Sequence, residues 1–153
     1  MIIRPAVTTD IDQLVVMSEK FYITAHLDEV GLGRRNESVA DYIKMMLPLD
    51  LFAIFVAIEA GWIRGTISGI RYPWLMDMSQ VLLMENWWWV DPDYRGSGMQ
   101  KRLEAELIAW GKEGGASRLI MVVSEGLTKK DALRRYYGRK GFEPMETHYI
   151  REI

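Results

Sequence analysis

The sequence VDPDYRGSGMQKRL, from Val90 to Leu103, leads from an apolar segment into an amphipathic one through Gly96 and Gly98. The residues before it, VLLMENWWWV, are typical of a β-strand, and the apolar spacing after it is typical of a helix. Glycines let a ligand approach the backbone closely, and the first N–H groups of a helix are unpaired and partly positive. The stretch therefore predicts a turn between strand and helix that can bind an anion such as a phosphate.

The two common nucleotide motifs do not fit this turn. A P-loop needs GxxxxGK[ST], which no glycine pair here satisfies. A dinucleotide fingerprint needs GxGxxG, whereas Lys101 stands at its third glycine position. The cations Arg95, Lys101 and Arg102 still favour an anionic ligand. A GxG pair alone is equally consistent with a plain tight turn, so its interpretation depends on the rest of the chain.

The segments on either side of the turn alternate between strand and helix patterns. Before it we expect a strand at 2–6, helices at 9–24 and 39–47, a hairpin formed by 51–58 and 63–72, and a strand at 81–90. After it we expect a helix at 99–113, a strand at 118–123, a basic helix at 130–140 and a final strand at 142–153. The order β-α-α-β-β-β-α-β-α-β predicts an α/β (α+β) fold in one domain, residues 1–153.

The composition excludes several kinds of site. The chain of 153 residues has no cysteine, so disulfides, thiolate nucleophiles and cysteine metal sites are impossible. Its only histidines, His26 and His148, cannot form a histidine-rich metal site, so we expect no metal. No apolar stretch approaches the roughly 18 residues of a membrane span, and the N-terminus lacks a signal-peptide pattern. We therefore expect a soluble, cytoplasmic protein that does not enter membranes.

Charge is distributed unevenly along the chain. Residues 95–140 contain eleven Lys or Arg against five Asp or Glu, whereas residues 1–94 contain seven against thirteen. Solvated helix faces alone can produce such a bias. The bias also fits an anionic ligand bound by the second part and a cationic one near the first.

Three segments together resemble the GNAT family of N-acetyltransferases. VDPDYRGSGMQKRL resembles the acetyl-CoA loop of that family, which runs V-x-P-x-[YW]-R-G-x-G from strand to helix. IIRPAVTTD resembles the family's first strand and helix cap, and ALRRYYGRKGF, from Ala132 to Phe142, resembles its A-x-x-x-Y-x-x-x-G-F ending. The resemblance covers essentially the whole chain, and it implies a mixed, mostly antiparallel sheet flanked by helices.

The resemblance implies acetyl-CoA as a cosubstrate, whose thioester carbonyl is attacked by a primary amine. The family binds it through the turn and through the strand end before the turn, where a backbone N–H also stabilises the oxyanion. Gln100 departs from the family pattern, and its side chain would either crowd the pyrophosphate or bond to it. The cofactor-binding residues implied in this way are Trp88, Val90, Arg95, Gly96, Ser97, Gly98, Met99 and Gln100.

The resemblance also implies an acid for the leaving thiolate. Tyr137 lies four residues before Gly141, as the tyrosine of the family does, and is therefore the expected proton donor. Tyr136 is the alternative if the register differs by one residue. The other ring of the two is expected to pack against the sheet.

Glu85 is the base that the resemblance implies, because many members carry a glutamate on this strand. Strict alternation from Val90 places Asn86 on the same face as Val90 and Glu85 on the other, and a β-bulge would reverse this. If Glu85 is not the base, Asn86 binds the substrate through a water, or the amine arrives neutral.

The leading hypothesis is an N-acetyltransferase acting on a small-molecule or peptide amine: a protein N-terminus or lysine, a polyamine, an amino acid or an aminoglycoside. The acidic residues 1–94 favour a cationic acceptor. A catalytically silent member that binds CoA or a partner protein is the alternative, and a homodimer is left open. The basic helix at 130–140 also suggests nucleic-acid binding, which the net charge of −2 argues against.

Overall fold

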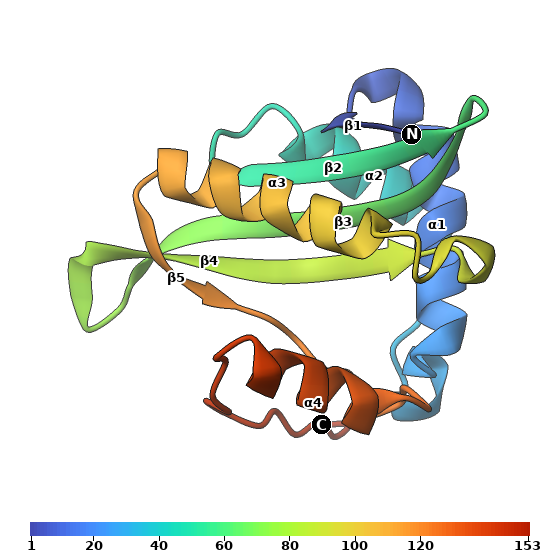
Figure 1. Cartoon of the computed structure of the whole chain (residues 1–153). Helices are drawn as coiled ribbons and strands as arrows, with labels where there is room; N and C mark the ends of the chain where they lie inside the picture. Colours follow the sequence, from blue (N-terminus) through green and yellow to red (C-terminus); the bar gives the residue numbers. More distant parts are fainter.

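A five-stranded sheet, in the order β1-β2-β3-β4-β5, forms the centre of the computed structural model, which describes residues 1–153 (Figure 1). Neighbouring strands are antiparallel except β4 and β5, which are parallel. The strands are β1 Ile2–Pro5, β2 Phe52–Glu59, β3 Trp62–Trp74, β4 Asp77–Val90 and β5 Ala116–Ile120. The helices are α1 Ile11–Thr24, α2 Asn36–Met46, α3 Met99–Glu113 and α4 Lys130–Arg139, with 3-10 turns at Thr8–Asp10, Leu27–Val30 and Pro92–Tyr94. This arrangement confirms the expected fold class.

Helices cover both faces of the sheet and create two core layers. In one layer, residues of α1 and α2 such as Leu14 and Ile43 pack against Trp89 of β4. In the other, Leu103 of α3 packs against Val90, the next residue of β4. Consecutive side chains of a strand point to opposite faces, so β4 supplies both layers. None of the helices combines the length and the apolar composition that a bilayer crossing requires.

A β-bulge in β4 changes which side chains face α3. Trp87 pairs with Ser68 and Glu85 pairs with Gly69, so Asn86 is an extra residue without an opposite partner on β3. A bulge of this kind reverses the alternation of side chains beyond it. Glu85 therefore lies on the α3 face together with Val90, and the strict alternation that would put Asn86 there does not hold.

The pairing of β4 with β5 ends halfway along β4. The two strands pair through Val81–Met84, and no strand borders that edge of β4 from Glu85 onward. The chain after β5 diverges from β4, and α4 lies beyond it (Figure 1). We call the region between Glu85–Val90 and residues 121–123 the β4–β5 wedge. It brings together β4, α3 and α4.

The expected final strand at 142–153 does not form, and the prediction of a last β element was wrong. Residues after Arg139 belong to no helix or strand and run past α4 in Figure 1. A strand needs a hydrogen-bonded neighbour, and this segment follows α4 instead of the free edge of β5. Its large side chains, including Met145 and Tyr149, are consequently exposed.

Candidate functional site

The turn between β4 and α3 has the conformation that its glycines predict. Gly96 and Gly98 both have φ of 87°, a left-handed conformation that other residues adopt at a cost in free energy. Gly98 is the N-cap of α3, and no side chain caps the helix except through a long bond of 3.4 Å from the Met99 N–H to Ser97 Oγ. The first N–H groups of α3 therefore remain free for an anion.

Arg95 holds this turn against the end of β4. Its Nε donates to the carbonyl oxygen of Val90 at 3.0 Å, and its guanidinium lies 4.8 Å from the centroid of the Trp89 ring. The side chain thus points back to the strand. Lys101 and Arg102, in the first turn of α3, are exposed and make no ion pair, so they are the cations free to meet a phosphate.

Asp91, which the sequence analysis did not identify, fixes the start of the turn. The buried carboxylate accepts hydrogen bonds from Lys20 of α1 at 2.7 Å and from Trp89 Nε1 at 3.2 Å, and Arg64 lies 3.5 Å away. Burial alone would raise the pKa of Asp91, but the bonds from Lys20 and Trp89 outweigh it and lower the pKa. An aspartate placed between a strand and Pro92 was the only signal in the sequence.

Glu85 crosses the β4–β5 wedge. Its side chain is only 4% exposed, and Oε2 accepts a hydrogen bond of 3.1 Å from the Val122 N–H, which follows β5. Burial raises the pKa of Glu85 to about 7, and the bond from Val122 only partly opposes this rise. Glu85 can therefore gain or lose a proton near neutral pH.

Tyr137 reaches the wedge from α4. Its side chain is 6% exposed, and its hydroxyl has no hydrogen-bond partner. Its ring lies 5.3 Å from that of Phe142, centroid to centroid. Burial raises the pKa of Tyr137, and the nearby charges of Glu85 and Glu104 raise it further. The phenol therefore stays protonated at neutral pH, and the structure brings it close to Glu85.

Tyr136 points elsewhere although it precedes Tyr137 directly. Its hydroxyl donates to Glu104 Oε2 of α3 at 2.7 Å, and its ring lies 6.4 Å from that of Trp88. Burial and the bond to Glu104 raise its pKa to about 12. The two tyrosines thus differ clearly: the Tyr137 hydroxyl is free in the wedge, and the Tyr136 hydroxyl is engaged with α3. No pattern in the sequence pointed to Glu104.

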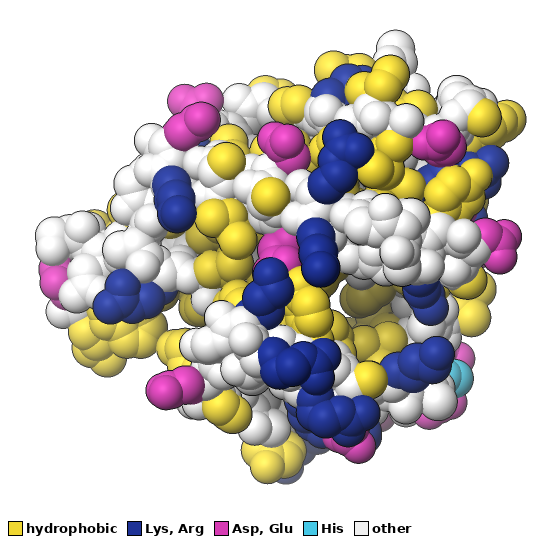
Figure 2. All heavy atoms as spheres, in the orientation of Figure 1, with side chains coloured by type: hydrophobic (Ala, Val, Ile, Leu, Met, Phe, Trp, Pro, Cys, Tyr) yellow, Lys and Arg dark blue, Asp and Glu magenta, His cyan; other side chains and the backbone are white.

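The remaining predicted residues lie around the same wedge. Trp88 is on the α3 side of β4, and its buried Nε1 has no partner. Asn86 is exposed at the bulge, away from Glu85. Figure 2 shows a hollow between α3 and α4 in which hydrophobic side chains are visible. The donors of Trp88 and Tyr137 are buried without a hydrogen-bond partner, which is uncommon for buried polar groups and marks them as candidates for contact with a polar ligand.

A separate cavity of about 400 Å³ lies between α3, β5 and the end of α4. It does not include Glu85 or Tyr137, but it reaches Lys101 in the first turn of α3. Its lining mixes apolar residues, cations that make no ion pair, and the carboxylate of Glu104. The cationic residues of its lining are Lys101, Lys112, Arg118 and Lys140, and the apolar ones include Leu83, Ile108, Leu119 and Phe142.

The mixed sheet, with one parallel strand pair that separates beside a glycine turn and a helix N-terminus, agrees with the fold that the sequence resemblance implied. The chain belongs to the Acetyltransferase (GNAT) family, whose model matches residues 24–142. The resemblance found in the sequence is thereby confirmed. A sequence search of curated proteins found no match.

Solved structures share the fold at low sequence identity. The complex of AAC(6')-Iy with the bisubstrate analog CoA-S-monomethyl-acetylneamine is 18% identical, with a TM-score of 0.76 over 99% of this chain and 97% of that one. A predicted acetyltransferase from Clostridium acetobutylicum, solved with acetyl-CoA, is 18% identical, with a TM-score of 0.75 over 99% and 95%. A ribosomal-protein-alanine N-acetyltransferase from Brucella melitensis biovar Abortus 2308 is 17% identical, with a TM-score of 0.72 over the full length of both chains. These likenesses establish the fold.

Proposed function

We propose that this protein is an N-acetyltransferase that transfers the acetyl group of acetyl-CoA to a primary amine by direct attack. The observation that carries the proposal is the free, buried Tyr137 hydroxyl in the β4–β5 wedge, together with a glycine turn that opens helix α3 on the same sheet. The Tyr137 hydroxyl is a proton donor, and the glycine turn is an anion site. Transfer from a thioester that is linked to a pyrophosphate needs both. Membership of the acetyltransferase family supports the same reaction.

The residues present fit the cosubstrate. The turn from Gly96 to Gln100 would hold the pyrophosphate through its unpaired N–H groups, since only those of Ser97 and Met99 already have partners. Lys101 and Arg102 would be the counter-charges. The free edge of β4 at Trp88 and Val90 would bind the pantetheine arm and donate an N–H to the carbonyl oxygen, where negative charge develops. Acetyl-CoA supplies the thioester that the amine attacks.

Two residues would move the protons. Tyr137, kept neutral by its raised pKa, would donate its phenolic proton to the leaving sulfur, whose thiol has a reference pKa of about 8.5. Glu85, with a pKa of about 7, would take up the proton of the amine. Because its side chain is buried, we propose that this proton passes through a water. Asn86, exposed at the bulge, would contact the acceptor.

We further propose a cationic amine as the acceptor, since residues 1–94 carry thirteen acidic against seven basic side chains. The neighbouring structures include enzymes named for aminoglycosides and for a ribosomal protein, which are two acceptors of this charge. Because one sheet spans from β1 to β5 and both helical layers cover it, residues 1–153 would act as one domain. We propose that the protein works in the cytoplasm.

The test is binding followed by turnover. Acetyl-CoA should raise the melting temperature, because a ligand that binds only the folded state stabilises it by mass action. A panel of amines, including a polyamine, an aminoglycoside and peptides, should then release free CoA thiol. Stabilisation without thiol release from any amine would favour a silent CoA-binding module, and no stabilisation would contradict the proposal.

A further inference from the structure

Glu104 is a buried carboxylate of α3 that lines the cavity between α3, β5 and the end of α4. Its side chain is 5% exposed, and the neighbouring Leu103 and Leu107 are completely buried. No cation lies within ion-pair distance of Glu104, and its one hydrogen bond comes from the Tyr136 hydroxyl. Burying a charged group is costly unless it is paired. A glutamate at this position therefore lowers the stability of the folded protein. Its presence is explained if the bond to Tyr136 serves the function of the protein.

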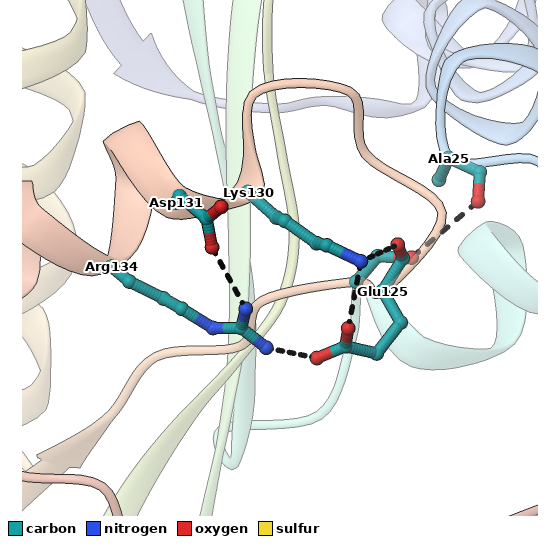
Figure 3. Close-up of polar contacts among 6 residues, drawn as sticks. Ala25, Glu125, Lys130, Asp131 and Arg134 are labelled. Carbon is teal, nitrogen blue, oxygen red and sulfur yellow. Dashed lines mark hydrogen bonds and ion pairs between the residues drawn. The ribbon is translucent and has the colours of Figure 1, made fainter.

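The same bond is the only side-chain hydrogen bond or ion pair that joins α4 to another helix or strand. The other polar contacts of α4 are local. Lys130 and Arg134 bind Glu125 in the loop before the helix, and Arg134 also binds Asp131 within it (Figure 3). The local contacts fix the start of α4 to its own loop. Only Tyr136 ties the helix to α3.

The position of Tyr137 depends on where α4 lies. Its hydroxyl makes no hydrogen bond, so only packing and the helix backbone hold it. Tyr136 is the adjacent residue, with ring centroids 5.8 Å apart. A shift of α4 away from α3 would therefore move the Tyr137 hydroxyl out of the wedge. Displacements of about 1 Å are enough to reduce a reaction rate strongly.

We propose that Glu104 and Tyr136 are positioning residues, whose hydrogen bond holds α4 against α3 so that the Tyr137 hydroxyl stays in the β4–β5 wedge. This inference rests on the proposed function. It adds to it a pair that touches neither cosubstrate nor acceptor and acts only through Tyr137. Burying Glu104 lowers the stability of the folded protein, and in return its bond to Tyr136 keeps the Tyr137 hydroxyl in position.

Three variants separate positioning from simple stabilisation. Tyr136→Phe keeps the ring but leaves Glu104 unpaired, so both the melting temperature and kcat should fall, the latter about 10-fold or more. Glu104→Gln keeps an oxygen that accepts from Tyr136, and its kcat should stay within about twofold of the parent. The double variant Glu104→Leu with Tyr136→Phe removes both polar groups, so the melting temperature should recover, because apolar replacements of buried polar pairs are often neutral or stabilising. Its kcat should stay low, with the KM for acetyl-CoA nearly unchanged.

Glu106→Gln is the matched control, since Glu106 is exposed on the same helix and should tolerate the change. Recovery of both melting temperature and kcat in the double variant would show that the pair is merely structural and would overturn the proposal. Full kcat in Tyr136→Phe would do the same.

Amide hydrogen exchange in residues 130–139 gives a readout that needs neither cosubstrate nor activity. Tyr136→Phe should speed exchange there about 10-fold, the usual effect of losing a hydrogen bond to a charged group, while α1 stays unchanged. Unchanged exchange in α4 would overturn the inference. If the parent releases no thiol with any amine, the proposed function fails, and this measurement still decides whether the pair holds α4.

Discussion

Tyr137 is the residue on which the proposed chemistry depends most directly. Tyr137→Phe removes one hydroxyl that has no hydrogen-bond partner, so stability and acetyl-CoA affinity should be preserved. Turnover should fall by a factor on the order of 10² to 10⁴, as expected when a proton donor is lost. Steady-state thiol release at saturating acetyl-CoA measures this change.

Tyr149→Phe is the control for Tyr137, because Tyr149 is almost fully exposed and removed from the wedge. Normal turnover in Tyr137→Phe would remove this tyrosine from the mechanism. A deep loss confined to Tyr136→Phe, with a normal Tyr137 variant, would move the acid by one residue.

Glu85 links pH to stability. Folding raises its pKa from 4.5 to about 7, so the folded protein binds the proton more tightly than the unfolded chain between these values. The free energy of unfolding therefore falls as the pH rises through this window. The Glu85→Gln side chain cannot ionise. Above pH 7 this variant should therefore be more stable than the parent, by at most about 3 kcal/mol. At pH 5 the two should differ little.

Urea unfolding of both proteins at pH 5 and pH 8.5 measures this difference, with Glu106→Gln as an exposed control. An equal stability difference at both pH values would show that Glu85 does not titrate in the folded state. If Glu85 is also the base, kcat/KM of the parent should increase as the pH is raised through 7, and the variant should lose this increase while it gains stability. Such an exchange of activity for stability is common at functional sites.

At the scale of elements, the turn from β4 into α3 combines a strand end, two left-handed glycines and a free helix N-terminus. Gly98→Asp would strain the backbone at φ of 87° and place a negative charge beside the N–H groups that should bind a pyrophosphate. We expect acetyl-CoA to stop raising the melting temperature of this variant, which calorimetric titration would confirm as lost binding.

Gly61→Asp provides the matched control for Gly98. Gly61 also has a left-handed φ, 80°, and open space around it, but it lies in the turn between β2 and β3. Both variants should lose a similar amount of stability, and only the Gly98 variant should lose the cosubstrate. Equal binding in both would rule out the turn as the phosphate site.

At the scale of the whole molecule, the wedge is closed by a contact between segments far apart in the chain. The loop before α4 meets the end of α1 so closely that a Cβ on Gly126 would lie 1.9 Å from the Ala25 carbonyl oxygen. Ser124 also reaches that oxygen, with its Oγ donating at 3.5 Å. This contact fixes the loop that leads into α4, the helix that carries Tyr137, to the end of α1.

Gly126→Ala should force this loop away from α1, because the neighbour is backbone and cannot rotate aside. We expect a loss of about 1–3 kcal/mol in the free energy of unfolding, together with a lower kcat. Gly138→Ala is the control: it lies within α4 with nothing near its missing Cβ, and it should stabilise the helix slightly. Urea unfolding of both variants measures the contrast, and equal stabilities would contradict the close approach.

The family and the order of the elements up to α4 followed from patterns that are local in the chain. Alternation, helical periodicity and the Gly96–Gly98 turn depend on residues close in sequence, and for this reason they predicted β4, α3 and their junction correctly. The spacing from Tyr137 to Gly141 likewise pointed to the tyrosine that the structure turns into the wedge. The catalytic roles of Tyr137 and Glu85 remain predictions.

Tertiary structure alone decided the rest, because it depends on which distant groups meet. The bulge at Asn86 arises from the pairing of β4 with β3, and it turned Glu85 to the α3 face. The segment 142–153 has the residues of a strand but no neighbour to pair with, so it stays irregular. The bond between Glu104 and Tyr136 joins residues that no periodicity relates, and the burial that raises the pKa of Glu85 comes from elements packed around it. The environment of a side chain depends on the whole folded chain, whereas a sequence pattern reports only on residues that are close together in the sequence.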